Sequence, residues 1–243
     1  MLLGYCRSIT QTLDELDGEF TLRARDVRGV VRIAMSASMA QHVIIPSLDE
    51  LTSKHPGLIV DLAGSDALVD MSCDGIDIAI RTGSTLTEEV TAKQIGSHGR
   101  RLYPSPLYVK KHGKPKHPDD LAKHRIITTS TVPRLNDWPL IIDGKPDTRP
   151  MHGQLRASIT SITQEMALAG LGICRVHDLI AASLVKKHEL VEVLEKFSDQ
   201  QFVPVYAMML PELHRLPMIR ACVHFFWSGW MPKFGGSVVA KSA

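Results

Sequence analysis

Hydroxyl-bearing residues gather where the apolar stretches of this sequence end. Hydroxyls and the N–H groups at helix N-termini donate hydrogen bonds to small ligands, and open α/β sheets bind their ligands at the carboxyl ends of strands. The same hydroxyls also serve as ordinary helix caps and loop residues, so both interpretations stand. The candidate ligand-binding residues are Ser36, Ser38, Met39, Ser65, Thr82, Gly83, Thr128, Thr129, Ser130, Thr160, Ser161, Arg175 and His177.

Arg175 and His177 are the unusual members of this set. A guanidinium group grips a carboxylate through two hydrogen bonds, and an imidazole changes charge near neutral pH. An alternating strand can instead point Arg175 at solvent. Arg81, near the end of another apolar stretch, is expected to make a structural ion pair with Asp77 or Asp74 rather than a ligand contact.

Catalytic and metal-binding patterns are missing from the sequence. It contains no GxSxG, HExxH or phosphate-binding loop, and Gly170 and Gly172 end a predicted helix rather than begin one. His112, His117 and His124 fall in a stretch rich in Pro and Lys without metal-ligand spacing. The four cysteines form no CxxC pair, which favours reduced thiols. We therefore expect no enzyme activity, no cofactor and no metal.

Composition limits the class of partner. The chain has 243 residues with 44% hydrophobic and 22% charged side chains, and its formal charge of +2 is too small to indicate nucleic acid as a partner of this segment. The N-terminus lacks the pattern of a signal peptide, and no apolar stretch approaches the roughly 18 residues of a membrane span. We therefore expect a cytoplasmic protein that is neither exported nor membrane-embedded.

The order of the predicted elements indicates a two-lobed α/β protein. Strands are expected at 30–35, 58–62 and 75–83, with a helix through residue 51 that breaks at Pro46 and a short helix at 67–73. A second set comprises strands at 126–127, around Trp138, and at 153–158, 172–176 and 190–194, with helices at 161–169 and 179–187. A late strand at 205–210 and a helix at 217–227 continue the first set. Alternating strands and helices are typical of parallel sheets.

These elements predict four segments. Apolar residues within 2–20 recur every three or four positions, so 1–26 is expected to hold either a dimerising helix or a helix packed on its own domain. Residues 27–100 with 205–230 form the first predicted lobe, and 101–204 form the second. Two crossover strands would join them. Residues 231–243 are expected to be a flexible tail.

Several short motifs, in this order and spacing, resemble the effector-binding domain of LysR-type transcriptional regulators over about residues 1–228. They are Gly29-Val30-Val31-Arg32-Ile33, Pro46 with Leu48, His55-Pro56, the segment 75–83 (GIDIAIRTG), Ser105-Pro106-Leu107-Tyr108, Gly113 and Pro115 before Asp120-Leu121, Trp138, and Ala169-Gly170-Leu171-Gly172-Ile173. The chain departs from the family pattern at Pro104, at Ser158 and at Arg175-Val176-His177.

The resemblance implies a fold and a function. The fold is two Rossmann-like lobes of the type 2 periplasmic-binding-protein architecture, preceded by a helix, with a cleft that binds a small effector such as a carboxylate. It also implies a homodimer or homotetramer that reaches promoter DNA through a winged helix-turn-helix, which this sequence does not contain. The expected function is effector sensing that controls transcription. The alternative is a solute-binding protein of a transport system with the same fold.

Overall fold

The computed structural model describes residues 27–66, 70–83, 90–199 and 201–229, which divide into two compact units. Among these residues, the first unit contains 27–35, 47–95 and 205–229, and the second contains 36–46 and 96–204. The division differs from the predicted lobes at 36–46 and 96–100, which belong to the second unit. The helix predicted at 2–20 and the tail at 231–243 lie outside the described residues.

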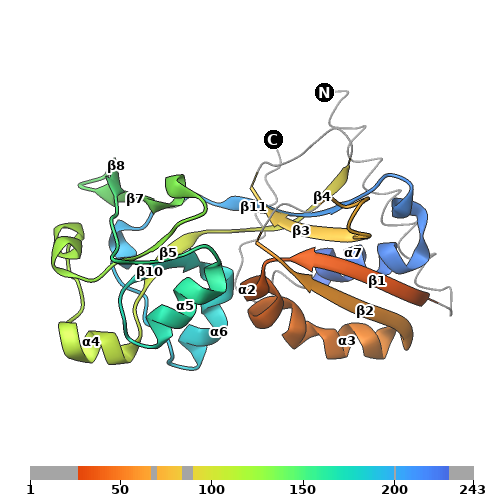
Figure 1. Cartoon of the computed structure of the whole chain (residues 1–243), viewed down its shortest axis with the longest axis horizontal. Coiled ribbons are helices and arrows are strands. Elements are labelled where there is room, and N and C mark those ends of the chain that lie inside the picture. The colour runs from red at the N-terminus through yellow and green to blue at the C-terminus, as the bar shows by residue number, and fades with distance from the viewer. Residues whose placement is uncertain (1–26, 67–69, 84–89, 200, 230–243) are drawn as a thin grey trace. The chain divides into compact units, whose positions relative to one another are not determined.

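In the described part of the chain, the first unit is built on a five-stranded sheet of order β2-β1-β3-β11-β4 (Figure 1). Its central strand β3 (Ile78–Thr82) lies parallel to β1 and antiparallel to β11. The predicted parallel sheet is therefore a mixed sheet with a parallel half. The other strands are β1 (Arg28–Met35), β2 (Gly57–Gly64), β4 (Thr91–His98) and β11 (Val203–Met209).

Helices cover the apolar face of this sheet. Helix α7 (Pro217–Gly229) packs on β1, and α3 (Leu48–Lys54) packs on β2. Val31 and Ile33 of β1 and Phe226 of α7 have no exposed surface. Each such side chain contributes about 1.5 to 3 kcal/mol through burial, so this layer supplies much of the stability of the first unit.

The predicted break at Pro46 is confirmed. After β1 the chain forms a short α2 (Ala37–Met39), a π-helical turn (Ala40–Ile44) and a 3₁₀ turn (Ile45–Ser47) before α3 begins. Proline has no N–H to donate and its ring clashes with the carbonyl four residues earlier, so a regular α-helix cannot run through it. The helix predicted at 67–73 is not seen in its described part, where Met71–Gly75 form a turn.

Three strand pairs form the framework of the second unit. β5 (Arg100–Tyr103) pairs antiparallel with β10 (Cys174–His177), β6 (Ile127–Thr129) parallel with β9 (Leu155–Ala157), and β7 (Asp137–Ile142) antiparallel with β8 (Lys145–Pro150). α5 (Thr160–Leu168) packs on β6 and β10, and α6 (Asp178–Lys186) packs on β10 and β5. α4 (Pro106–His112) follows β5, and its Tyr108 is buried beside Trp138 of β7. Residues of β5, β6 and β10 line the candidate site.

The strand predicted at 190–194 is wrong. Among the described residues this segment makes a single isolated bridge, between Val193 and Leu102. Leu194 has a left-handed backbone with φ of 57°, and a 3₁₀ turn (Glu195–Phe197) follows it directly. Left-handed backbone cannot continue an extended strand, so the apolar residues of this segment pack into the core as a loop instead.

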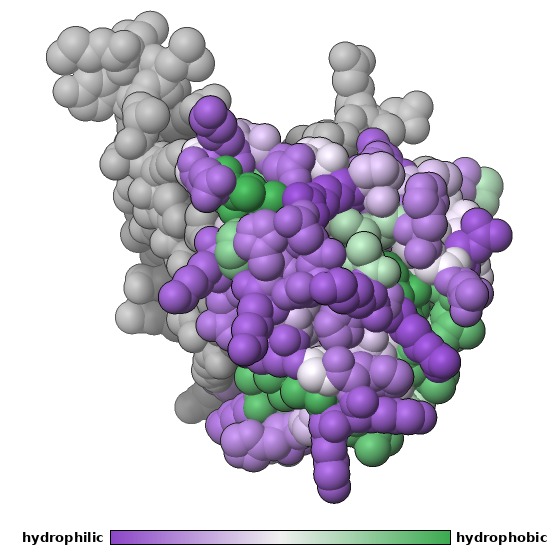
Figure 2. All heavy atoms as spheres, turned by 90° about the vertical axis from the view of Figure 1, so that its left-hand side faces the viewer, coloured by the Kyte–Doolittle hydropathy of each residue, from purple (hydrophilic) through white to green (hydrophobic). Residues whose placement is uncertain are grey.

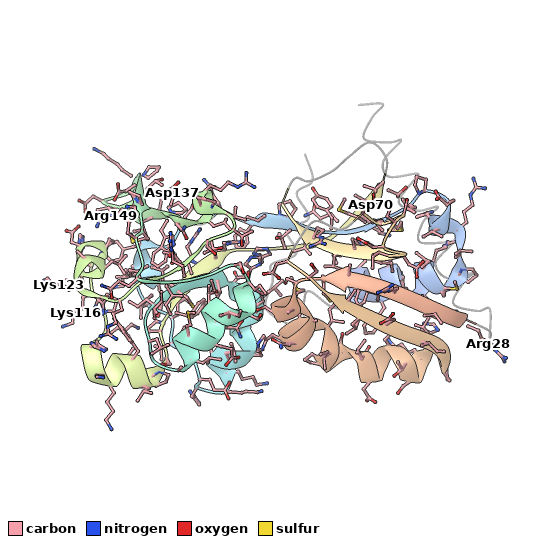
Figure 3. All side chains as sticks on the ribbon, viewed as in Figure 1. Arg28, Asp70, Lys116, Lys123, Asp137 and Arg149 are labelled. Atoms are coloured by element: carbon pink, nitrogen blue, oxygen red, sulfur yellow. The ribbon has the colours of Figure 1, made fainter. Side chains whose placement is uncertain are left out.

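The outer face of the second unit is hydrophilic. Figure 2 shows mostly polar residues over this face, with small separate apolar patches. In Figure 3, Lys116 and Lys123 lie at its outer edge and Arg149 lies on the β7–β8 side, where it makes a 2.7 Å ion pair with Asp119. His117 Nδ1 lies 3.0 Å from the carboxylate of the same aspartate, so this histidine makes a polar contact at the surface. None of the described helices is long and apolar enough to cross a membrane.

Candidate anion-binding site

A small cavity of about 40 Å³ opens in the second unit, between the ends of its strands and the start of α5. That volume suits a carboxylate or another small oxyanion, or a few water molecules. Its walls are Arg100, Ile127, Thr128, Thr129, Leu135, Asn136, Trp138, Thr160, Thr163, Cys174 and Arg175. None of these residues carries a carboxylate, whereas two carry guanidinium groups.

Arg100 and Arg175 come from neighbouring strands. In the antiparallel register Arg100 faces His177 and Arg175 faces Leu102, so alternation places these four side chains on one face of the β5–β10 pair. Arg175 is half-buried on this face and lines the cavity, which replaces the interpretation that it points at solvent.

Burial and mutual repulsion act on both arginines. Burial, together with the positive charge of Arg175, lowers the pKa of Arg100 to about 10. Burial also lowers the pKa of Arg175, and the negative charge of Asp199 partly opposes this shift. Both groups stay charged at neutral pH, and the like charges repel each other. An anion between them would relieve that repulsion.

Thr128 places a hydroxyl at the same cavity. The residue is 3% exposed, and its Oγ1 has no hydrogen-bond partner among the residues that the structure describes. Buried hydroxyls are nearly always paired, because an unpaired one loses its hydration without compensation. The Thr128 hydroxyl is therefore a candidate donor to a ligand.

The remaining polar walls are held in place by local hydrogen bonds. Asn136 exchanges two bonds with the backbone of Thr129, accepting from its N–H at 2.9 Å and donating to its carbonyl at 2.8 Å. Thr160 begins α5, whose N-terminus has no side-chain cap, and Thr163 donates to the Thr160 carbonyl at 2.7 Å. The positive end of the α5 dipole thus borders the cavity and adds to its preference for negative charge.

The structure brings together only part of the predicted site. Thr128, Thr129, Thr160 and Arg175 line the cavity. Ser130 is exposed in the turn after β6, and Ser161 lies in the first turn of α5 outside the cavity wall.

Ser36, Ser38 and Met39 belong to a different part of the second unit. Ser36 caps α2 by accepting from the Met39 N–H at 3.3 Å, and Met39 is buried. Ser38 has no exposed surface and donates to Gln164 Oε1 at 3.2 Å. Gln164 Nε2 also contacts His42 Nε2 at 2.6 Å. These residues form a network that ties α2 and the π-helical turn to α5.

Ser65, Thr82 and Gly83 lie in the first unit, where two of them are part of the sheet framework. The Ser65 N–H donates to the Met35 carbonyl at 2.7 Å, and Thr82 pairs with Val205 of β11. Gly83 has a φ of 92°, which favours glycine.

The predicted ion pair of Arg81 with Asp77 or Asp74 is not formed. Arg81 instead donates to the Ser65 carbonyl at 3.3 Å and is stabilised by the charge of Asp66. Asp77 accepts from the backbone N–H of Arg32 at 2.8 Å. Alternation along the chain places residues 77 and 81 on one face of the sheet. The Asp77 carboxylate is nonetheless hydrogen-bonded to β1, the parallel neighbour of β3.

His177 is not in the cavity wall. It is 7% exposed and its ring stacks on that of His98, with ring centroids 3.9 Å apart. His98 is fully buried at the end of β4. His177 is half of a buried imidazole pair on the same sheet face as Arg100 and Arg175.

Comparison with known proteins decides the family. The family model described as the LysR substrate binding domain matches residues 24–230. The chain belongs to the LysR family of transcriptional regulators. It is 31% identical over 193 residues to the HTH-type transcriptional regulator YhjC of Escherichia coli K12, covering 77% of this chain and 64% of that relative. It is 25% identical over 174 residues to CrgA of Neisseria meningitidis serogroup C, covering 71% of this chain and 58% of CrgA.

Solved LysR-type structures show the same fold. The regulatory domain of CrgA from Neisseria meningitidis superposes with a TM-score of 0.78 at 21% identity, covering 84% of this chain and 99% of that domain. A second solved structure of CrgA from Neisseria meningitidis superposes with a TM-score of 0.81 at 20% identity, covering 96% of this chain and 79% of that one. The expected type 2 periplasmic-binding-protein architecture is thereby confirmed. LysR-type regulators are not enzymes, and they bind small-molecule effectors.

Sequence reasoning missed Arg100, Asn136 and Thr163 in this LysR-type domain. The signal for Arg100 was present: it begins the Arg100–Tyr103 strand, and strict alternation sends it and Arg101 to opposite faces. Arg101 pairs with Glu192 at 3.5 Å, whereas Arg100 faces the cavity. The signal for Thr163 was its spacing of three residues from Thr160, which puts both on one side of α5.

Proposed function

We propose that this domain is the effector sensor of a LysR-type transcriptional regulator and that its effector carries an acidic group, which binds in the cavity between Arg100 and Arg175. Binding would control how the regulator, as a homodimer or homotetramer in the cytoplasm, acts on promoter DNA. Family membership favours this role over that of a solute-binding protein for transport. A ligand shifts such a regulator only if it binds its two conformations with different affinities.

One observation carries the proposal: two half-buried guanidinium groups and an unpaired buried hydroxyl meet at a cavity whose walls hold no carboxylate. Two arginines can hold an oxyanion with charge-assisted hydrogen bonds, which are about twice as strong as neutral ones. Thr128 can donate a further bond. The cavity has room for the acidic group, and the rest of the effector would lie outside it.

Calorimetry with a panel of short carboxylates and inorganic oxyanions tests the proposal. Arg175→Gln keeps a long polar side chain and removes the charge, so we expect affinity to fall at least about tenfold, the effect of losing one charged hydrogen bond. Arg156→Gln is the matched control, because Arg156 is exposed on β9 and pairs in register with Thr128 without lining the cavity. Equal affinities in all three proteins, or no binding of any anion, would refute the proposal.

A further inference from the structure

Two buried histidines stand beside the candidate site. His98 ends β4 and His177 ends β10, and their rings stack with centroids 3.9 Å apart and planes inclined by 23°. Their exposed fractions are 0% and 7%. Two imidazoles so deeply buried and so close can share at most one added proton, because two like charges in this position would repel strongly.

The pair contains a bare proton-accepting nitrogen. His98 Nδ1 lies 3.0 Å from the Gly99 carbonyl, which can only accept, so Nδ1 carries the hydrogen. In the neutral ring, His98 Nε2 therefore holds a lone pair. His98 Nε2 and His177 Nδ1 both lack a hydrogen-bond partner within the described parts of the chain. A buried polar atom without a partner requires an explanation.

Burial, with the charges of Arg100 and Arg175, explains why the pair is neutral without a ligand. Burial, helped by the charge of Arg100, lowers the pKa of His98 to about 4. Burial, His98, Arg100 and Arg175 together lower the pKa of His177 well below its usual value. From α6, Asp178 accepts from the Gly99 N–H at 3.0 Å, and burial raises the pKa of this carboxyl.

The same two arginines thus face the cavity and oppose the proton. We propose that the His98–His177 pair is a proton-binding site coupled to the cavity, so that the domain takes up one proton when an anion binds to Arg100 and Arg175. This rests on the proposed function of the cavity. The anion cancels the positive charge that, in addition to burial, keeps the pair neutral. A proton given up by hydronium or a buffer acid then adds to an imidazole lone pair.

The coupling acts in both directions. If the anion strengthens proton binding, a proton on the pair must strengthen anion binding by the same factor. The domain then responds to its anion and to pH together, with tighter binding in acid. Uptake of one whole proton sets an upper limit of about tenfold in affinity for each pH unit.

Calorimetric titration of the whole chain with sulfate or methanesulfonate provides the test, because these anions keep a constant charge between about pH 5.5 and about pH 7.5. We expect affinity to rise by about threefold or more from the higher to the lower pH, within the limit for one proton. Titrations in buffers with different ionisation enthalpies should show proton uptake on binding. Binding with an unchanged affinity and no proton uptake would overturn the coupling and leave the proposed function intact.

Variants locate the proton. His98→Gln and His177→Gln retain a polar side chain that does not titrate, and each should flatten the pH dependence. His152→Gln is the control, since His152 is exposed on the same unit, and it should behave as the wild type. A pH dependence that survives in both pair variants would overturn the assignment. If one variant fails to fold, the other still locates the proton, and proton uptake by the wild type still tests the coupling. Failure of any anion to bind at either pH would refute the proposed function and the coupling together.

Discussion

Replacing Thr128 with valine should make the ligand-free protein more stable and weaken anion binding. The two side chains have nearly the same shape, so the change removes the hydroxyl and leaves the packing of β6 intact. In most buried positions the loss of a hydroxyl costs stability, because its partner is left unpaired. The Thr128 hydroxyl has no such partner among the described residues.

The size of both effects follows from this environment. With 3% of the residue exposed, the hydroxyl has little access to bulk solvent and no protein partner among the described residues. An unpaired buried hydroxyl costs about 1 to 3 kcal/mol, so we expect Thr128→Val to raise the free energy of unfolding by about 1 kcal/mol. Losing its bond to a bound anion costs about 1.5 kcal/mol or more, which is at least about tenfold in affinity.

Urea unfolding and calorimetry measure the two quantities on the same preparations. Thr163→Val is the matched control, because Thr163 lines the same cavity at 8% exposure while its hydroxyl donates to the Thr160 carbonyl at 2.7 Å. We expect the control to lose about 1 kcal/mol of stability. If Thr128→Val loses as much as the control, the hydroxyl has a partner and the reasoning fails. A gain in stability with unchanged affinity would remove Thr128 from the site.

Two further predictions concern the fold. His98, with a pKa of about 4, and His177, with a pKa well below its usual value, are neutral in the folded chain at neutral pH. The pair therefore leaves the free energy of unfolding unchanged above about pH 6.5, where the unfolded chain is neutral too. Between about pH 6.5 and about pH 4 the free energy of unfolding falls by about 1.4 kcal/mol per pH unit for each proton that only the unfolded chain takes up. Urea midpoints should record this loss, and an equally steep loss in His98→Gln would contradict the cause. Gly172→Ala should destabilise the chain by about 2 kcal/mol or more, since the added Cβ would lie 2.7 Å from the Arg125 carbonyl oxygen. Thermal unfolding measures this, and a melting temperature equal to that of the wild type would show that the backbone moves aside at little cost.

Local patterns predicted most of the framework. The apolar run before Thr82, the break at Pro46 and the helix that begins at Thr160 depend on neighbouring residues alone, so the sequence contains their causes. The strand predicted at 190–194 failed because apolar content indicates burial without indicating backbone direction. The left-handed Leu194 was not visible in that pattern.

The candidate site was only half predictable for a related reason. The sequence by itself determined which hydroxyls and cations stand at strand ends, including Thr128 and Arg175, because strand ends follow from local periodicity. Only the tertiary structure decided which of them meet. Arg100 and Arg175 lie 75 positions apart in the sequence, and the antiparallel register of β5 and β10 brings them to one face. That register depends on how whole strands pack, so no local pattern encodes the pairing of the two charges or their burial.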